Sequence, residues 1–183
     1  MKCEPNIVRF SIQIVTQVVL KENWRTTMSN KAVQDCYAEE FAHCYGCGRL
    51  NQEGMQIKSY WDGQECVCHY KPRPYYTGGF PGFSYGGLIS SLIDCHGAAT
   101  ASAAKLQSEG FTLDDRPPFR FVTASLKVDF LKPTPIDKVL ELKGKPMEIS
   151  DRKVIVSVTL SAEGEICAKG EAVMVKLPDG VKK

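Results

Sequence analysis

The longest apolar stretch of the chain covers residues 88–107 and predicts a buried helix. Apolar or small residues occupy nearly every side of a helix drawn over this stretch, and a helix without a polar face is buried. Gly110 is a plausible stop signal just beyond it. At about 1.5 Å per residue the helix would be about 30 Å long, enough to cross a small domain.

The chain after this helix has the apolar–polar alternation of β-strands. The expected strands are residues 122–130, 139–145, 154–160 and 166–177. Before the helix, residues 55–61 and 65–70 predict two more strands, and Asp62-Gly63 between them is a hairpin signal. The short connections imply antiparallel pairing.

One long helix and about six antiparallel strands define an α+β domain. A single sheet can bury such a helix only by curling around it, which predicts the hotdog fold. A sheet of this kind has open edges, and pairing two sheets edge to edge covers them. We therefore expect a homo-oligomer, either a dimer or a tetramer.

The first 28 residues differ from the rest, and their apolar positions fit a strand or a short helix equally well. We interpret residues 1–28 as an extension and residues 29–183 as the domain. An amphipathic membrane anchor is disfavoured because basic residues are sparse there.

Ser29 or Asn30 would cap a short helix at the start of the domain, which runs to about Ala42. Residues 71–87 are rich in Pro, Gly and aromatic residues and are expected to form a loop.

Composition narrows the function classes. Of the 183 residues, 43% are hydrophobic and 24% charged, with a formal net charge of +2. This balance is too near neutral to indicate nucleic-acid binding, although it suits an anionic substrate. Neither a clear signal peptide nor a bilayer span is visible, so the expected location is cytoplasmic with reduced thiols.

Asp94 is the residue that local structure does not explain. It lies two turns into the apolar helix, where Asp has poor propensity and a buried carboxylate costs several kcal/mol. A carboxylate can activate water or attack a carbonyl directly. The alternative is a structural acid satisfied by Ser90, Ser91 or a neighbouring strand.

Four short motifs, in this order, resemble hotdog acyl-CoA thioesterases of the phenylacetyl-CoA type. They are Cys44-Tyr45-Gly46-Cys47-Gly48, Pro81-Gly82-Phe83-Ser84-Tyr85-Gly86-Gly87, Leu92-Ile93-Asp94, and Thr123-Ala124-Ser125-Leu126 continuing through Asp129-Phe130-Leu131-Lys132-Pro133. Each motif is weak alone, but together their order and spacing are fairly specific. The resemblance covers roughly residues 44–177.

The resemblance implies hydrolysis of an acyl-CoA thioester without a cofactor, in a site shared by two protomers. Gly86 of one chain would polarise the thioester carbonyl through its backbone N–H, and Asp94 with Thr123 would come from the other chain. A backbone N–H at a helix start can stabilise the charge on that oxygen. Tyr85 replaces the family histidine, and Gly87 lets the substrate approach closely.

Other polar residues are weaker candidates. We place Thr123, Ser125 and Lys127 on one polar strand face, with Ser125 and Lys127 as substrate contacts. Lys127, Lys132 and Arg120 are candidate contacts for coenzyme A. His96 is two residues past Asp94 and so points to another side of the helix; we expect it to be a satisfied buried histidine.

The cysteines suggest zinc only weakly. Cys44 and Cys47 have ligand spacing, but the Cys66-x-Cys68 pair on a strand does not. We therefore expect no metal and interpret the Cys44 loop as packing over the helix end.

The alternative function is a non-catalytic acyl-CoA or lipid-binding module, which the Tyr85 replacement favours. A hotdog dehydratase is disfavoured because it needs a histidine at the loop position.

Overall fold

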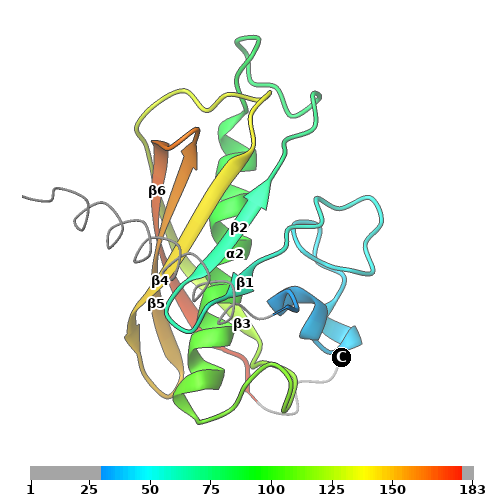
Figure 1. The fold of residues 1–183 in the computed structure, drawn as a ribbon, viewed down its shortest axis with the longest axis vertical. Coiled ribbons are helices and arrows are strands. Elements are labelled where there is room, and N and C mark those ends of the chain that lie inside the picture. Colours follow the sequence, from blue (N-terminus) through cyan, green and yellow to red (C-terminus); the bar gives the residue numbers. More distant parts are fainter. Residues whose placement is uncertain (1–29, 179–183) are drawn as a thin grey trace, which may run out of the picture.

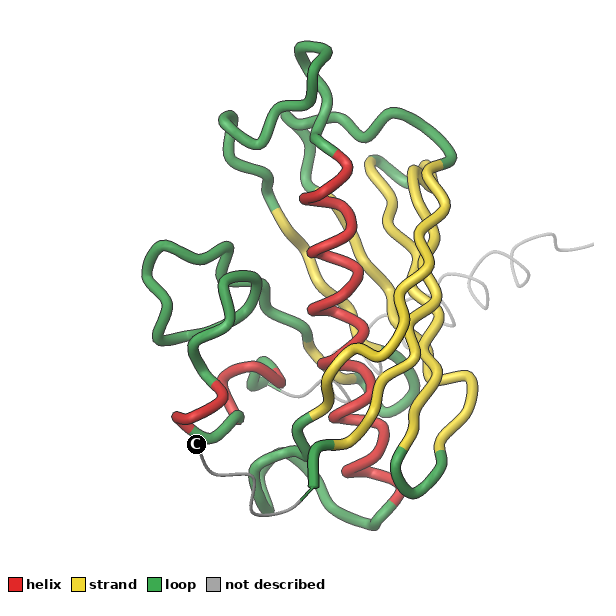
Figure 2. The backbone as a smooth tube through the Cα atoms, turned by 180° about the vertical axis from the view of Figure 1, so that it is seen from behind, coloured by secondary structure: helices red, strands yellow, loops and turns green. Residues whose placement is uncertain are grey.

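The computed structural model describes residues 30–178. The predicted extension over residues 1–28 lies outside the described residues, as do residues 179–183. The described part contains one long helix, six strands and two short 3-10 helices. The helix runs along one face of the sheet, as Figures 1 and 2 show from opposite sides.

The predicted central helix is confirmed as α2 (Gly86–Ser108). It begins two residues earlier than predicted, after Tyr85 in extended conformation, and Gly110 follows its end with φ +82°. From Leu88 to Leu106 most of its side chains are buried. Among residues 30–178, no helix combines the length and apolar character that a membrane span needs.

All six strands pair antiparallel in one sheet, in the spatial order β1-β2-β4-β5-β6-β3. Their bounds are β1 (Tyr60–Trp61), β2 (Cys66–Tyr70), β3 (Phe121–Phe130), β4 (Leu140–Ile149), β5 (Lys153–Ala162) and β6 (Glu165–Lys176). This arrangement confirms the hotdog fold. The short β1 and the long β3 form the two edges.

Two glycines set how closely the helix lies on the sheet. A Cβ on Gly144 of β4 would overlap the Thr100 hydroxyl, and one on Gly170 of β6 would overlap the Ile93 side chain. Strand β5 contributes the regular apolar face that the alternation predicted, with every second residue buried. The helix is therefore fixed in depth and rotation, which fixes the direction of Asp94.

The segment before β1 differs from the prediction. Instead of one helix to Ala42 there are two 3-10 turns, η1 (Val33–Cys36) and η2 (Glu39–Phe41), separated by extended residues. The predicted strand over residues 55–61 is reduced to β1. Gln56 has φ +57°, and the N–H groups of Met55 and Ile57 bond to carbonyls of residues 45 and 46. Residues 55–57 therefore bond to the loop at residues 45 and 46 instead of pairing with a neighbouring strand.

Candidate active site

Asp94 and Thr123 lie together, as the resemblance implies. The Thr123 hydroxyl on β3 donates a hydrogen bond to Oδ1 of Asp94 on α2, and it also lies 3.5 Å from the Met174 sulfur. Asp94 is half-buried rather than fully buried, because β3 is an edge strand with no neighbour beyond it in the described chain. Ser91 is not its partner, since that hydroxyl bonds to the Gly87 carbonyl.

A β-bulge determines which residues share a face with Asp94. The register between β3 and β6 shifts between Thr123 and Ser125, so that Ala124 is an extra residue. Thr123 therefore faces the helix, on the same side as Leu126 and Val128, which pack on the core. The predicted common face of Thr123, Ser125 and Lys127 is wrong.

The outer face of β3 carries the other two predicted contacts. Lys127 and Asp129 form an exposed ion pair there, with 3.2 Å between Nζ and Oδ2. Ser125 lies two residues before Lys127 and so shares its face. Because Asp94 faces the inner side of β3, the side chains of Ser125 and Lys127 do not lie beside it within one chain.

The start of α2 presents free backbone donors. The N–H groups of Ser84 and Tyr85 bond to the carbonyls of Thr134 and Tyr76, at 2.8 and 3.1 Å. The next two N–H groups, of Gly86 and Gly87, find no protein acceptor within residues 30–178. Both glycines are exposed, and the helix dipole adds positive potential at this end. The site can therefore bind a developing oxyanion.

The missing side chain of Gly87 also accommodates a neighbouring aromatic ring. A Cβ at this residue would overlap the ring of Tyr85, so the missing side chain makes room for that ring. Tyr85 is 39% exposed, and its ring centroid is 6.3 Å from that of Tyr76. The aromatic side chain thus lies over the first turn of the helix, beside the free donors.

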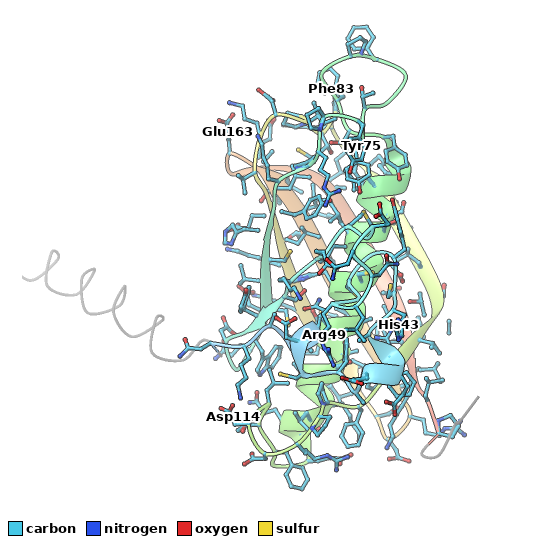
Figure 3. All side chains as sticks on the ribbon, turned by 90° about the vertical axis from the view of Figure 1, so that its right-hand side faces the viewer. His43, Arg49, Tyr75, Phe83, Asp114 and Glu163 are labelled. Atoms are coloured by element: carbon cyan, nitrogen blue, oxygen red, sulfur yellow. The ribbon has the colours of Figure 1, made fainter. Side chains whose placement is uncertain are left out.

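A groove of about 720 Å³ opens at this same end of the molecule. Its walls are mostly apolar and come from the loop before α2, the first turn of α2 and the end of β3. The residues that define it include Phe80, Phe83, Tyr85, Gly86, Phe130 and Lys132. Figure 3 shows Phe83 and Tyr75 at this end. Sequence reasoning missed Phe130, whose ring lies 3.4 Å from where a Cβ on Gly86 would be.

Gly86 and Asp94 are too far apart to act on one carbonyl from the same chain. They are eight residues apart on one helix, which at 1.5 Å per residue means about 12 Å along its axis. A thioester carbonyl requires contacts of about 3 Å from both groups.

Two of the candidate cations are placed clearly. Lys132 lines the groove and forms an ion pair with Glu165. Arg120 is half-buried, with its guanidinium 4.9 Å from the centroid of the Tyr37 ring. Arg120 comes just before β3, whereas the groove lies at the far end of that strand. Because β3 has ten residues, at about 3.3 Å each the two ends are about 33 Å apart. The structure does not bring Arg120 to the groove.

His96 is a satisfied core residue, as expected. Its Nδ1 lies 2.8 Å from Ser59 Oγ and its Nε2 3.1 Å from the Cys66 carbonyl. Burial lowers the pKa of this imidazole to about 4. The ring is therefore neutral at physiological pH and lies away from the groove lining.

Known proteins share both the sequence and the fold. The family model described as thioesterase superfamily matches residues 81–168. An acyl-coenzyme A thioesterase THEM4 of Xenopus laevis is 31% identical over 106 residues, 58% of this chain and 41% of that protein. The match thus spans about two fifths of the length of that curated relative.

Two solved structures are also similar. A thioesterase superfamily protein from Shewanella loihica is 42% identical with a TM-score of 0.58, over 78% of this chain and all of that one. The PaaI protein of E. coli, from the phenylacetic acid degradation operon, has a TM-score of 0.56 at 13% identity, over 68% and 81% of the two chains. The second likeness concerns the fold alone.

The described residues form a hotdog domain in which a carboxylate on the central helix pairs with a hydroxyl on the edge strand β3, and free N–H groups lie at the start of that helix. The chain belongs to the thioesterase superfamily.

Proposed function

We propose that this protein is an acyl-CoA thioesterase, which hydrolyses an acyl-CoA thioester to a free acid and coenzyme A. The observation that carries the proposal is the Asp94–Thr123 hydrogen bond at an open strand edge, in a fold with free N–H donors at Gly86 and Gly87. The curated relative named above is itself called an acyl-coenzyme A thioesterase, which supports the same substrate class.

In the proposed reaction, Asp94 takes a proton from a water molecule that attacks the thioester carbon, or attacks that carbon itself and is released by water. The N–H of Gly86 donates to the carbonyl oxygen as negative charge develops there. Thr123 holds the carboxylate in position through its hydroxyl. Cleavage of the carbon–sulfur bond releases the coenzyme A thiolate, which takes up a proton.

The 12 Å separation of Gly86 and Asp94 supports a site built by two protomers. The unpaired edge of β3 offers the surface on which a second copy would add its own β3. Val122 and Phe130 on this strand are 43% and 55% exposed in one chain, which suits burial in such a pairing. A dimer is the smallest assembly that brings Gly86 of one chain to Asp94 of the other.

The groove supports an arrangement for the substrate. Its aromatic walls suit an acyl group or the pantetheine arm, and Lys132 at its margin suits a phosphate. Ser125 and Lys127 would contact substrate only where it extends over the outer face of β3.

A second candidate function is a non-catalytic acyl-CoA or lipid-binding module. The specific observation behind it is Tyr85, which stands where the family has histidine and fills the space above Gly87. Both candidates predict binding of acyl-CoA, but only the enzyme releases free thiol.

The test is a screen of short, long and aromatic acyl-CoAs for thiol release, combined with binding measurements. Turnover well above the rate without protein supports the enzyme, and binding without turnover supports the second candidate.

The shared site is tested by mixing Asp94→Asn chains with Gly86→Pro chains, where proline keeps the helix start but removes the N–H. A shared site predicts recovery of about a quarter of wild-type activity in a random dimer mixture. Each chain alone stays inactive, and absence of recovery contradicts the shared site.

A further inference from the structure

Three cysteine thiols form a compact cluster that the proposed reaction does not use. Cys44 and Cys47 come from the loop before Asn51, and Cys95 comes from helix α2. Their sulfur atoms all lie within 4.8 Å of one another, and the Cys44 and Cys95 sulfurs are 3.9 Å apart. Cys66 and Cys68, which the sequence associates with Cys44 and Cys47, are not members of the cluster.

The sulfur spacing fits a tetrahedral metal ion. With zinc–sulfur bonds of about 2.3 Å, tetrahedral geometry places two ligand sulfurs about 3.8 Å apart. A disulfide would require about 2.05 Å. The 3.9 Å between Cys44 and Cys95 matches the metal geometry.

The loop is built to hold this cluster. A Cβ on Gly46 would overlap the Cys95 sulfur, so glycine is required for the loop to reach the helix. The N–H of Gly48 donates to the Cys44 carbonyl at 2.8 Å, and a Cβ on Gly48 would overlap the backbone of Cys44. The loop can therefore fold back on itself and reach the helix only with glycine at both positions.

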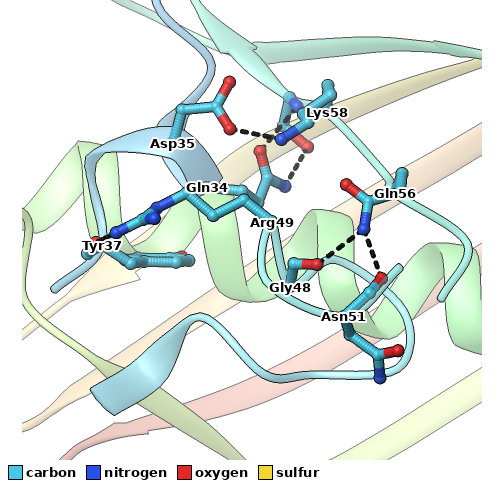
Figure 4. A network of polar contacts seen from close by, with 9 residues as sticks. Gln34, Asp35, Tyr37, Gly48, Arg49, Asn51, Gln56 and Lys58 are labelled. Carbon is cyan, nitrogen blue, oxygen red and sulfur yellow. Dashed lines mark hydrogen bonds and ion pairs between the residues drawn. The ribbon is translucent and has the colours of Figure 1, made fainter. Parts of the chain in front are cut away.

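Further hydrogen bonds keep the loop in this shape. The Gln56 amide donates to the carbonyls of Gly48 and Asn51, at 2.8 and 2.5 Å (Figure 4). Cys47 and Cys95 are buried whereas Cys44 is only half-buried, which leaves a route by which an ion can enter.

A positive charge within electrostatic range of the cluster suits a metal–thiolate complex. The Arg120 guanidinium is near enough for its charge to act on all three thiol groups. Its Nη1 atom is buried and has no hydrogen-bond partner among the described residues. Three thiolates and Zn²⁺ carry a net charge of −1, which one guanidinium balances. The same ligands around a monovalent ion would carry −2.

We propose that Cys44, Cys47 and Cys95 bind one Zn²⁺ ion, with the fourth position open to water or a small ligand. This reverses the expectation of a metal-free loop, which considered Cys66 and Cys68, and not Cys95, as further ligands. The site ties the loop to the turn of α2 that carries Asp94, the residue before Cys95. The ion thereby positions that turn, and the proposal does not depend on the proposed function.

The test is metal analysis of the full chain, purified under reducing conditions without chelator. We expect one zinc per chain, and three thiols that become reactive toward a thiol reagent only after a chelator is added. Co²⁺ exchanged into the protein should give the sulfur-to-metal charge-transfer absorption of a tetrahedral thiolate site. Cys95→Ser should lose that absorption, and Cys36→Ser, outside the cluster, should keep it.

Two results would overturn the proposal. One is a folded protein that retains no zinc at micromolar free zinc and whose thiol reactivity a chelator does not change. The other is a native disulfide among these three cysteines without bound metal. The wild-type measurements decide the matter even where Cys95→Ser fails to fold. Because the readouts are metal content and absorption, they are independent of thioesterase activity.

Discussion

The hydroxyl of Thr123 on β3 donates to the carboxylate of Asp94 on α2, linking an edge strand to the central helix. The two residues are 29 positions apart in sequence. The contact exists because the β-bulge at Ala124 turns Thr123 toward the helix. It defines the orientation of the carboxylate on which the proposed mechanism depends.

Replacing Asp94 by Asn keeps the shape of the side chain but removes its charge. Thioesterase turnover should fall by at least ~100-fold, the usual scale for losing a positioned acid–base group. The free energy of unfolding should change by less than about 0.5 kcal/mol, because Asp94 is half-buried and Thr123 can still donate to an amide oxygen. Kinetics and urea unfolding on one preparation test both statements. Full activity would end the assignment of Asp94.

Thr123→Val removes the hydroxyl at nearly constant volume. Turnover should fall about tenfold because the carboxylate loses its fixed orientation, a barrier of about 1.4 kcal/mol. Thr123→Ser, which retains the hydroxyl, is the matched control and should stay near wild type. In the double variant with Asp94→Asn, the Thr123→Val effect should vanish, as expected for residues that act together. Additive effects would separate Thr123 from the mechanism.

Gly86→Pro tests the backbone donor directly. Tyr85 is already extended, with φ −74° and ψ 151°, so a following proline is sterically acceptable at the first helical position. Turnover should fall by about 100-fold or more, the scale for losing one oxyanion donor. Gly86→Ala keeps the N–H and meets only ordinary contact with Phe130, so it should retain most activity. Equal losses in both variants would point to steric obstruction instead.

Tyr85→His restores the family residue at the start of the helix. Activity should be kept or raised if the tyrosine merely replaces that histidine, and a steady-state comparison on the best acyl-CoA measures it. Gly87→Ala is an informative companion, since its Cβ displaces the Tyr85 ring without removing it. A tenfold loss in Tyr85→His would show that the tyrosine has its own role in the site.

His96 predicts a pH dependence of stability. Burial lowers the folded-state pKa of His96 to about 4, against the ordinary value of 6.5, so the unfolded chain binds the proton more readily. The stabilisation is complete above pH 6.5 and is lost as the pH falls toward 4, by up to about 3 kcal/mol. Urea midpoints at pH 7.5 and 4.5 measure the loss, which His96→Asn should reduce. His69→Gln, at a largely exposed histidine, should leave it unchanged.

The sequence predicted the elements whose pattern is regular over many residues. The central helix lacks a polar face and β5 alternates strictly, so periodicity alone identified them. The predicted strand over residues 55–61 failed because Gln56 adopts a positive φ that no local signal announces. The helix expected to end near Ala42 divides at Tyr37, whose backbone is extended.

The site was predictable only where a motif marked its residues. Asp94 is visible as a charge in an apolar helix, but its half-exposure depends on β3 being an edge. The face of Thr123 depends on a bulge, and one extra residue reverses the alternation. Cys95 joins Cys44 and Cys47 only through the packing of loop on helix, so its sequence separation concealed the cluster.

The bulge in β3 also has a consequence for how this protein can evolve. It separates the strand into an inner set, Thr123 with Leu126 and Val128, and an outer set, Ser125 with Lys127 and Asp129. Substitutions in the outer set leave the Asp94 partner and the core untouched, so their effect is confined to contacts on that face. Deleting Ala124, by contrast, would rotate Thr123 away from the helix in a single step. Point substitutions on the outer face and single-residue deletions at the bulge therefore face very different selection.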